Sequence, residues 1–282
     1  MTKKVLASFL VAALYLLSSI DLFAQQTSDL QSQITKVNLS QAEIDRIIRA
    51  FSAKETEFRQ ALNQYAFKRE ATIQSLGFGG QVSGEMRRDS SFVFGDNGAR
   101  YEKVLFAPVS TLKDLLLTPE DIEDLGGVNQ FALEASKIPF YNFTFLGKEK
   151  IDELNLYVFD VAPKQMPDAK KTKERFFLGR IWVDDQDLQI VKSKGKGVPE
   201  TKDNKFPVVE TYRENVDGKY WFPTYAYAND QLFFEKSGQT LRLKMKVKFS
   251  DYKQGRATVR VLDDDAEVKE ETKQPQNSPK KP

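Results

Sequence analysis

The sequence predicts an α+β fold that is mainly β: a curved antiparallel sheet, or incomplete β-barrel, with helices covering its concave face. From residue 65 onward, apolar residues recur at every second position in about ten short runs, as in half-buried strands. Turn formers such as Asp96-Asn97-Gly98 separate these runs. Before them, one stretch with helical spacing has an apolar face that needs a surface to cover.

The pattern divides the chain into four parts, which differ in composition and in period. We expect a signal peptide over residues 1–24, a polar segment with an amphipathic helix over 25–64, the half-barrel over 65–262 with inserted helices at about 111–138, and a disordered charged tail over 263–282. The tail is rich in charge and almost without large apolar residues, so it lacks the apolar surface that would offset its ordering entropy.

The first residues are typical of a Sec-type signal peptide. Lys3 and Lys4 precede an apolar or small run from Val5 to Ile20, and Ala24 is a plausible cleavage point. The alternative is a retained membrane anchor, but the run is shorter than the ~20 apolar residues that span a bilayer comfortably. The chain has no cysteine, so neither a diacylglyceryl anchor nor a disulfide is available. We therefore expect a periplasmic protein that is stabilised by its core.

A helix is predicted from about Gln41 to Gln64. Ser40 and Glu43 form a capping box in front of it. Apolar residues follow at intervals of three and four, as on the buried face of a helix: they are Ile44, Ile47, Ile48, Phe51, Phe58 and Leu62. We expect this helix to pack on a sheet; a coiled coil is the weaker alternative, because the apolar stripe lapses between Phe51 and Phe58.

Ten strands are predicted after this helix, joined by hairpin turns into an antiparallel meander. Their expected ranges are Tyr65–Ile73, Gln81–Phe94, Arg100–Pro108, Tyr141–Gly147, Leu156–Ala162, Arg175–Val183, Leu188–Lys194, Val208–Arg213, Tyr220–Tyr227 and Leu241–Phe249. One or two short helices interrupt the meander between Thr111 and Ile138: the first contains Leu112, Leu115, Leu116 and Leu117, and the second opens at Thr118-Pro119-Glu120 and closes at Gly126-Gly127.

The last predicted strand shows the two faces of the sheet most clearly. Leu241, Leu243, Met245, Val247 and Phe249 point one way, and a cationic ladder of Arg242, Lys244, Lys246 and Lys248 points the other. Lysines on an edge strand prevent edge-to-edge aggregation, and this is the role that we expect for the ladder. The alternative is recognition of anionic headgroups.

The apolar side of the sheet is the candidate ligand-binding surface. A face of this size must curl over something, and volume that the helices leave unfilled forms an apolar cavity. The residues expected to line it are aromatic or aliphatic at alternating positions: Phe143, Phe145, Tyr157, Phe159, Phe177, Ile181, Leu243, Met245 and Val247. Any one of them is more often a plain core residue than part of a ligand wall, so the prediction rests on the set as a whole.

Three segments resemble the outer-membrane lipoprotein-sorting proteins of the LolA-like superfamily: LGKEKIDELNLYVFDVAPK at Leu146–Lys164, GRIWVDDQDLQIVKSKGK after Leu178, and ETYRENVDGKYWFPTYAY at Glu210–Tyr227. The resemblance implies a periplasmic half-barrel whose helices close the concave side, where acyl chains or hydrophobic partners are held. Asp152-Glu153-Leu154-Asn155 departs from the tight Asp-Gly turn of many members, and the long amphipathic helix and the charged tail are additional.

Composition excludes several other classes of function. A net charge of +2 gives no reason to expect nucleic-acid binding. Without His or Cys, the chain has no Ser-His-Asp triad, no cysteine nucleophile and no zinc site built from those residues. Asp184, Asp185 and Asp187 lack the spacing of a calcium loop and are expected to be a solvated turn.

We therefore expect a non-enzymatic carrier without a cofactor or metal, which binds lipid, the acyl chains of a lipoprotein or another apolar molecule. One alternative is a regulatory module that uses the same surface to bind a membrane or envelope protein, and a helical cover packed too tightly to open would favour it. A second is a hydrolase with paired carboxylates, which two facing acids in an apolar cleft would favour.

Overall fold

The structure is a computed structural model that describes residues 34–255, except 114, 124, 127–132, 172–173 and 217. The predicted signal peptide and charged tail lie outside these residues. In the part of the chain that is described, no helix is long and apolar enough to cross a membrane.

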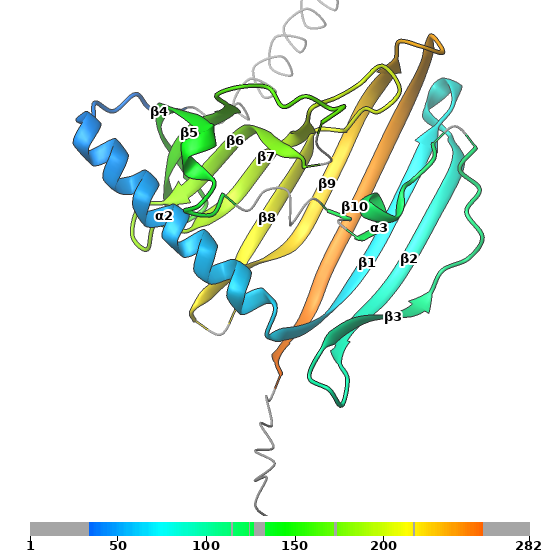
Figure 1. Cartoon of the computed structure of the whole chain (residues 1–282), viewed down its shortest axis with the longest axis horizontal. Coiled ribbons are helices and arrows are strands. Elements are labelled where there is room, and N and C mark those ends of the chain that lie inside the picture. Colours follow the sequence, from blue (N-terminus) through cyan, green and yellow to red (C-terminus); the bar gives the residue numbers. More distant parts are fainter. Residues whose placement is uncertain are drawn as a thin grey trace, which may run out of the picture.

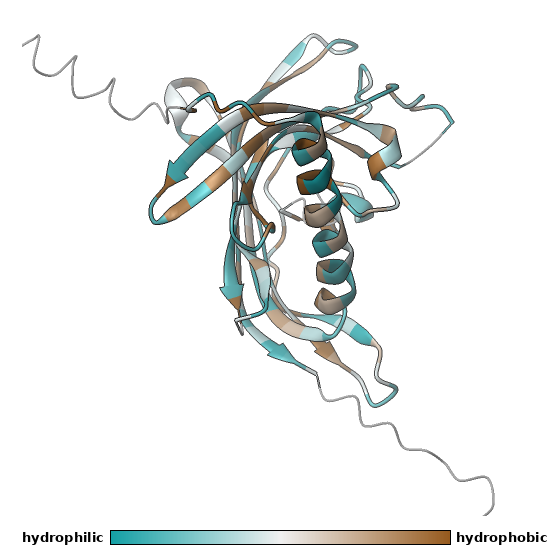
Figure 2. Ribbon diagram, turned by 90° about the vertical axis from the view of Figure 1, so that its left-hand side faces the viewer, coloured by the Kyte–Doolittle hydropathy of each residue, from teal (hydrophilic) through white to brown (hydrophobic). Residues whose placement is uncertain are grey.

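The predicted amphipathic helix is confirmed as α2, Gln41–Leu62. Its capping box is formed: the Glu43 backbone N–H donates to Ser40 Oγ at 3.3 Å, and the Ser40 N–H donates to Glu43 Oε2 at 3.0 Å. One face is buried through Ile47, Phe51, Phe58 and Leu62. Figure 2 shows this helix inside the curve of the sheet, so the helix covers the concave face as predicted.

All ten predicted strands are present and form one antiparallel sheet. They are β1 (Tyr65–Leu76), β2 (Val82–Phe94), β3 (Arg100–Phe106), β4 (Tyr141–Ile151), β5 (Leu154–Pro163), β6 (Phe176–Asp184), β7 (Ile190–Val198), β8 (Val209–Val216), β9 (Tyr220–Phe234) and β10 (Gln239–Gln254). The sheet is curved and open (Figure 1), so the fold is the expected half-barrel.

The strand order corrects the simple meander. It is β3-β2-β1-β10-β9-β8-β7-β6-β5-β4, so the first strand pairs with the last and two meanders are joined side by side. The β1–β10 pairing runs from Tyr65 opposite Gln254 to Leu76 opposite Arg242. As a result β3 and β4, which follow each other in sequence, lie at opposite edges, and the connection between them crosses the concave side (Figure 1).

The described residues of this crossing connection, 107–140, contain less helix than predicted. The helix α3, Pro119–Glu123, starts where the Thr118-Pro119-Glu120 pattern placed it, and a short 3-10 turn, η2, covers Ile138–Phe140. Residues 111–113 and 115–118 have no regular structure, so a helix at Leu112–Leu117 is wrong. Thr118 caps α3, because the Asp121 N–H donates to Thr118 Oγ1 at 3.2 Å.

The position of β10 also corrects the expected role of the cationic ladder. Strand β10 is paired with β1 on one side and β9 on the other, so it is an interior strand. Protection of a sheet edge therefore cannot explain Lys244, Lys246 and Lys248. Alternation in the sequence shows which face of the sheet a residue occupies but not which strands lie beside its own strand, so it could not show that β10 is an interior strand.

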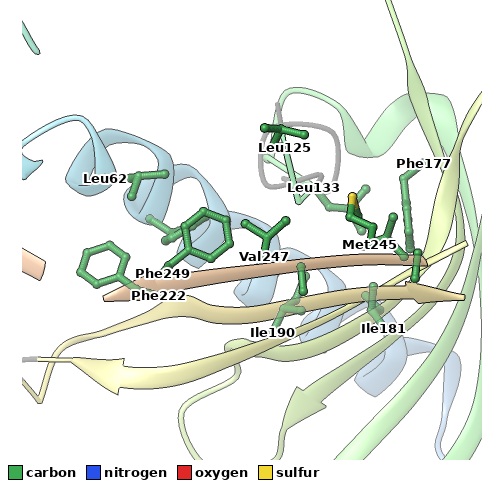
Figure 3. Close-up of a cluster of buried hydrophobic side chains, with 14 of the residues drawn as sticks. Leu62, Leu125, Leu133, Phe177, Ile181, Ile190, Phe222, Met245, Val247 and Phe249 are labelled. Carbon is green, nitrogen blue, oxygen red and sulfur yellow. The ribbon is translucent and has the colours of Figure 1, made fainter. Parts of the chain in front are cut away.

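One continuous core joins the concave face to its covers. Figure 3 shows Val247 and Phe249 of β10 beside Leu62 of α2, while Leu125 and Leu133 of the crossing connection lie over Met245 and near Phe177. Leu125 and Leu133 are 4% and 1% exposed, so these two residues of the crossing connection belong to the core.

An ion pair is buried in the centre of this core, between α2 and β8. Glu55 Oε1 accepts from Arg213 Nη1 at 2.6 Å and Glu55 Oε2 accepts from Arg213 Nη2 at 3.1 Å. The two side chains are 1% and 5% exposed, and the guanidinium carbon lies 4.6 Å from the centre of the Phe58 ring. The bidentate geometry satisfies both carboxylate oxygens and fixes the position of α2 along the sheet.

Removing one partner of this pair is expected to destabilise the fold strongly. Glu55→Leu leaves a buried guanidinium without its counterion, and we expect the free energy of unfolding to fall by about 3–5 kcal/mol. Replacing both charges, in Glu55→Leu/Arg213→Met, removes the unpaired charge and should restore most of the loss. Urea unfolding measures both effects; a Glu55→Leu variant within about 1 kcal/mol of the native chain would contradict the assigned role.

Candidate functional site

A cavity of about 310 Å³ opens on the concave side of the sheet, away from α2. It lies between the crossing connection, the loop from β7 to β8 and the turn from β9 to β10. The residues around it come from both meanders and from four connecting segments, the fourth being the β5–β6 loop with Arg175: they are Ile73, Leu115, Leu116, Leu117, Asp121, Leu125, Gly126, Arg175, Gly197, Asp203, Asn204, Lys205, Phe206, Pro207, Val209, Leu232, Phe234, Ser237, Gln239, Leu243 and Met245.

The floor of the cavity is apolar because inward-facing positions of neighbouring strands meet there. Ile73 of β1 is paired with Met245 of β10, and Leu243, Leu232 and Val209 extend the floor towards β8. All five side chains are less than 9% exposed. Strand alternation therefore produces a continuous hydrocarbon surface, to which an aliphatic chain can bind without leaving a polar group unpaired.

The roof is the crossing connection, which one buried arginine attaches to the sheet. Arg69 of β1 points into the concave side and donates to the carbonyl of Glu123 at 2.8 Å and to that of Ile122 at 3.0 Å. These carbonyls lie at the end of α3, where carbonyls have no helical partner and a cation is favourable. At Gly126, with φ of 93°, an added Cβ would lie 3.0 Å from the Phe249 ring, so glycine permits this close approach.

Glu102 of β3 binds two arginines, Arg69 and Arg88. It accepts two hydrogen bonds from Arg88, both at 2.9 Å, one from Ser90 at 2.6 Å and one from Arg69 at 3.2 Å. The hydrogen bonds from Arg88 are the main reason that the pKa of Glu102 falls to about 2, although partial burial opposes them. The carboxylate is thus charged at any physiological pH and orients Arg69.

Charged side chains surround the mouth of the cavity, and the acids among them have basic partners. Arg175 donates to Asp121 of α3 at 2.8 Å, and its guanidinium lies 4.4 Å from the centre of the Phe206 ring. Asp203 pairs with Lys236 at 3.0 Å. An apolar floor with a charged rim is typical of a site for a molecule with a hydrocarbon body and a polar end.

The nine predicted ligand-binding residues fall into two groups. Leu243 and Met245 line the cavity. The other seven belong to the core or are packed against it, and they are Phe143, Phe145, Tyr157, Phe159, Phe177, Ile181 and Val247. Phe143 and Phe159 contact the Phe51 ring of α2, with centroids 5.7 and 6.1 Å apart, so the helix covers this end of the face.

Most of the cavity wall could not be identified from the pattern of strands. Leu115, Leu117, Phe206 and Pro207 lie in loops, where no periodicity indicates a direction. The only available signal was the density of leucine in Leu112–Leu117, which we attributed to a helix. Arg175 was expected at the start of a strand, but not at the mouth of the cavity.

The acidic turn from Asp184 to Asp187 is more strongly constrained than a solvated turn. Asp184 is 4% exposed and accepts from the backbone N–H groups of Gln186 and Asp187 at 3.1 and 3.0 Å, while burial raises its pKa. Asp185 pairs with Lys148 at 2.8 Å, and Asp187 accepts from Trp221 Nε1 at 3.0 Å. Among the described residues, no group of three acids could hold a metal ion.

Fold and site together define an open antiparallel half-barrel with a covered apolar cavity on its concave face. The solved structures to which the chain is similar include a LolA superfamily protein from Nitrosomonas europaea, with 16% identity, a TM-score of 0.34, and coverage of 72% of this chain and 94% of that one. A DUF1329 family protein from Desulfovibrio piger gives 16% identity, a TM-score of 0.35, and coverage of 73% and 92%.

A third similar structure is a lipoprotein-sorting protein domain from Vibrio parahaemolyticus, with 12% identity, a TM-score of 0.31, and coverage of 72% and 91%. No family model and no curated protein matches the chain.

The low pKa of Glu102 predicts an acid-sensitive contribution to stability. Since its pKa is about 2 in the folded chain and near 4.5 when unperturbed, the contribution is complete above about pH 4.5 and is lost as the pH falls towards 2. We expect Glu102→Gln to cost about 3 kcal/mol at pH 7 and progressively less below pH 4.5. Urea unfolding across this pH range tests this; a pH-independent cost would contradict it, and Glu153→Gln, in an exposed turn, is the control.

Proposed function

We propose that the protein is a periplasmic binding protein that sequesters an apolar chain, from a lipid, a lipoprotein or another hydrophobic molecule, in the cavity under the crossing connection. The observation that carries the proposal is the cavity itself, with its floor of Ile73, Leu232, Leu243 and Met245. Its volume, about 310 Å³, lies at the lower end of the ~300–1,000 Å³ typical of small-molecule sites. This size suits one slender chain better than several.

The chain enters, in this proposal, by displacement of the crossing connection rather than of α2. Helix α2 is held by a buried ion pair and by aromatic contacts, which are costly to break. Arg69, Leu125 and Leu133 anchor the connection, but at the mouth of the cavity it is held by the pair Asp121–Arg175, whose side chains are 22% and 19% exposed. Such partly solvated contacts exchange with water at lower cost. Release follows when a membrane acceptor offers the chain a larger apolar environment.

A regulatory module that binds an envelope protein is the second candidate. It is favoured by the tight packing of α2, because a cover that does not open presents a fixed surface. Catalysis by paired carboxylates has less support, because Asp121 and Asp203 at the mouth of the cavity are ion-paired with Arg175 and Lys236. We therefore propose a non-enzymatic role.

Native mass spectrometry with lipid extraction, on the mature protein from the periplasm of its host, tests the proposal directly. A defined lipid or acylated protein that copurifies establishes the binding class and identifies the ligand. An empty protein that takes up no acyl probe contradicts the proposal and favours the regulatory module.

The affinity for fatty-acid probes should rise with chain length. Burial of each CH₂ contributes about 0.8 kcal/mol, which is roughly a fourfold gain in affinity, until the cavity is full. We expect Leu115→Trp, which places an indole in the cavity wall, to weaken binding at least tenfold with little change in melting temperature. Leu105→Trp is the matched control, because Leu105 lies on the exposed edge strand β3. Equal loss in both variants would exclude the cavity as the site.

Charge in the concave core should be disruptive, whereas charge on the other face should not. Phe145→Asp and Phe159→Asp place a carboxylate among aromatic rings and should abolish folding or apolar binding. Lys244→Glu changes only the convex face and should leave both nearly unchanged. Circular dichroism and probe titration measure the two properties; loss of probe binding in Lys244→Glu alone would contradict this separation of the faces.

A further inference from the structure

The convex face carries a stripe of four cations along β10, consisting of Arg242, Lys244, Lys246 and Lys248. They stand at alternate positions of a strand in the interior of the sheet, so their side chains share one face. Alternate residues are about 6.6–6.8 Å apart along a strand, so the stripe is roughly 20 Å long. Because the strand is not at an edge, protection against aggregation does not account for this stripe.

These cations differ from other lysines and arginines on the convex face by lacking an acidic partner. Lys192 and Lys194 pair with Glu210, and Lys68 pairs with Asp251. Within the described residues, none of the four stripe cations forms an ion pair. One acid, Glu70, stands opposite Lys248 in the strand register, which leaves the stripe with a positive excess.

An aromatic row lies beside the stripe on the neighbouring strand β9, interrupted by Asn229 and Gln231 opposite Lys244 and Arg242. Tyr225 is opposite Lys248, Tyr227 is opposite Lys246, and Phe233 is opposite Thr240 just beyond Arg242. The two tyrosine rings are stacked, with centroids 6.5 Å apart, and Phe233 is 53% exposed. Lysine and arginine bind anionic headgroups, whereas tyrosine and other aromatic rings favour the interface between headgroups and hydrocarbon.

We propose that this stripe, together with the aromatic row of β9, docks the protein on an anionic lipid surface. Charge complementarity supplies the attraction, and the aromatic row distinguishes a bilayer from a soluble polyanion. A convex surface touches a flat membrane over a narrow strip, and the cations occupy such a strip. The cavity is on the opposite face of the same strand, so docking is independent of the ligand in the cavity.

Cosedimentation of the full mature chain with vesicles tests the proposal. We expect binding to vesicles of mixed phosphatidylglycerol and phosphatidylcholine, none to phosphatidylcholine alone, and loss of binding at about 1 M salt, where the screening length falls to about 3 Å. Each lysine near an anionic surface contributes about fivefold. The variant Lys244→Gln/Lys246→Gln/Lys248→Gln should therefore bind at least tenfold more weakly, with unchanged melting temperature and unchanged uptake of an acyl probe.

The matched control is Lys170→Gln/Lys171→Gln/Lys202→Gln, which removes three exposed lysines from loops. It should stay within about twofold of the native chain, since surface potential decays over about a Debye length. An equal loss in both triple variants shows that net charge alone attracts the protein and overturns the assignment of a site.

The variant Phe233→Ser separates a bilayer from a soluble anionic partner. We expect it to weaken vesicle binding severalfold and to leave binding to heparin unchanged, because only a bilayer has an apolar layer beneath its charges. Absence of vesicle binding by the native chain overturns the proposal, and so does stripe-dependent binding to heparin alone, which would indicate an acidic macromolecule instead.

Discussion

The pairing of the first strand with the last determines the rest of this architecture. Because β1 pairs with β10, the two meanders become one sheet, and the consecutive strands β3 and β4 are left at opposite edges. Ten strands at about 4.8 Å spacing separate these edges by roughly 43 Å along the sheet. The connection of residues 107–140 must bridge that distance, and it crosses the concave side, where its leucines cover apolar surface. The cavity is thus the space that this crossing leaves unfilled.

The two covers of the concave face are held by different kinds of contact. Helix α2 supplies Phe51 and Phe58 to the core and is fixed by the buried Glu55–Arg213 pair. The crossing connection supplies Leu125 and Leu133, yet near the cavity it depends on Arg69 and on partly exposed pairs. Because buried charges resist separation more than solvated ones, entry of the proposed ligand costs less beside the Asp121–Arg175 pair than at α2 or at the buried Arg69.

Local periodicity and turn chemistry predicted α2 and all ten strands, because each depends on neighbours in sequence. Pairing of β1 with β10 depends on residues far apart, so no local pattern revealed it, and the interior position of β10 was missed for the same reason.

The buried ion pair between Glu55 and Arg213 did leave a signal in the sequence. Glu55 stands where the apolar stripe of α2 lapses, and Arg213 takes an inward position after Val209 and Thr211. Two opposite charges at core positions indicate a buried pair. Of the residues that line the cavity, strand alternation predicted only Leu243 and Met245.

Strand β10 connects the two surfaces to which we assign a function. Its inward residues Leu243 and Met245 form part of the cavity floor, and its outward residues Lys244 and Lys246 belong to the cationic stripe. A strand has only two faces, so a protein that rests on a membrane through the stripe keeps the cavity open towards the aqueous side. A ligand in the cavity would then be presented away from that membrane, to a second acceptor. In the two proposals together, opposite faces of one sheet separate attachment to a membrane from the binding of an apolar chain.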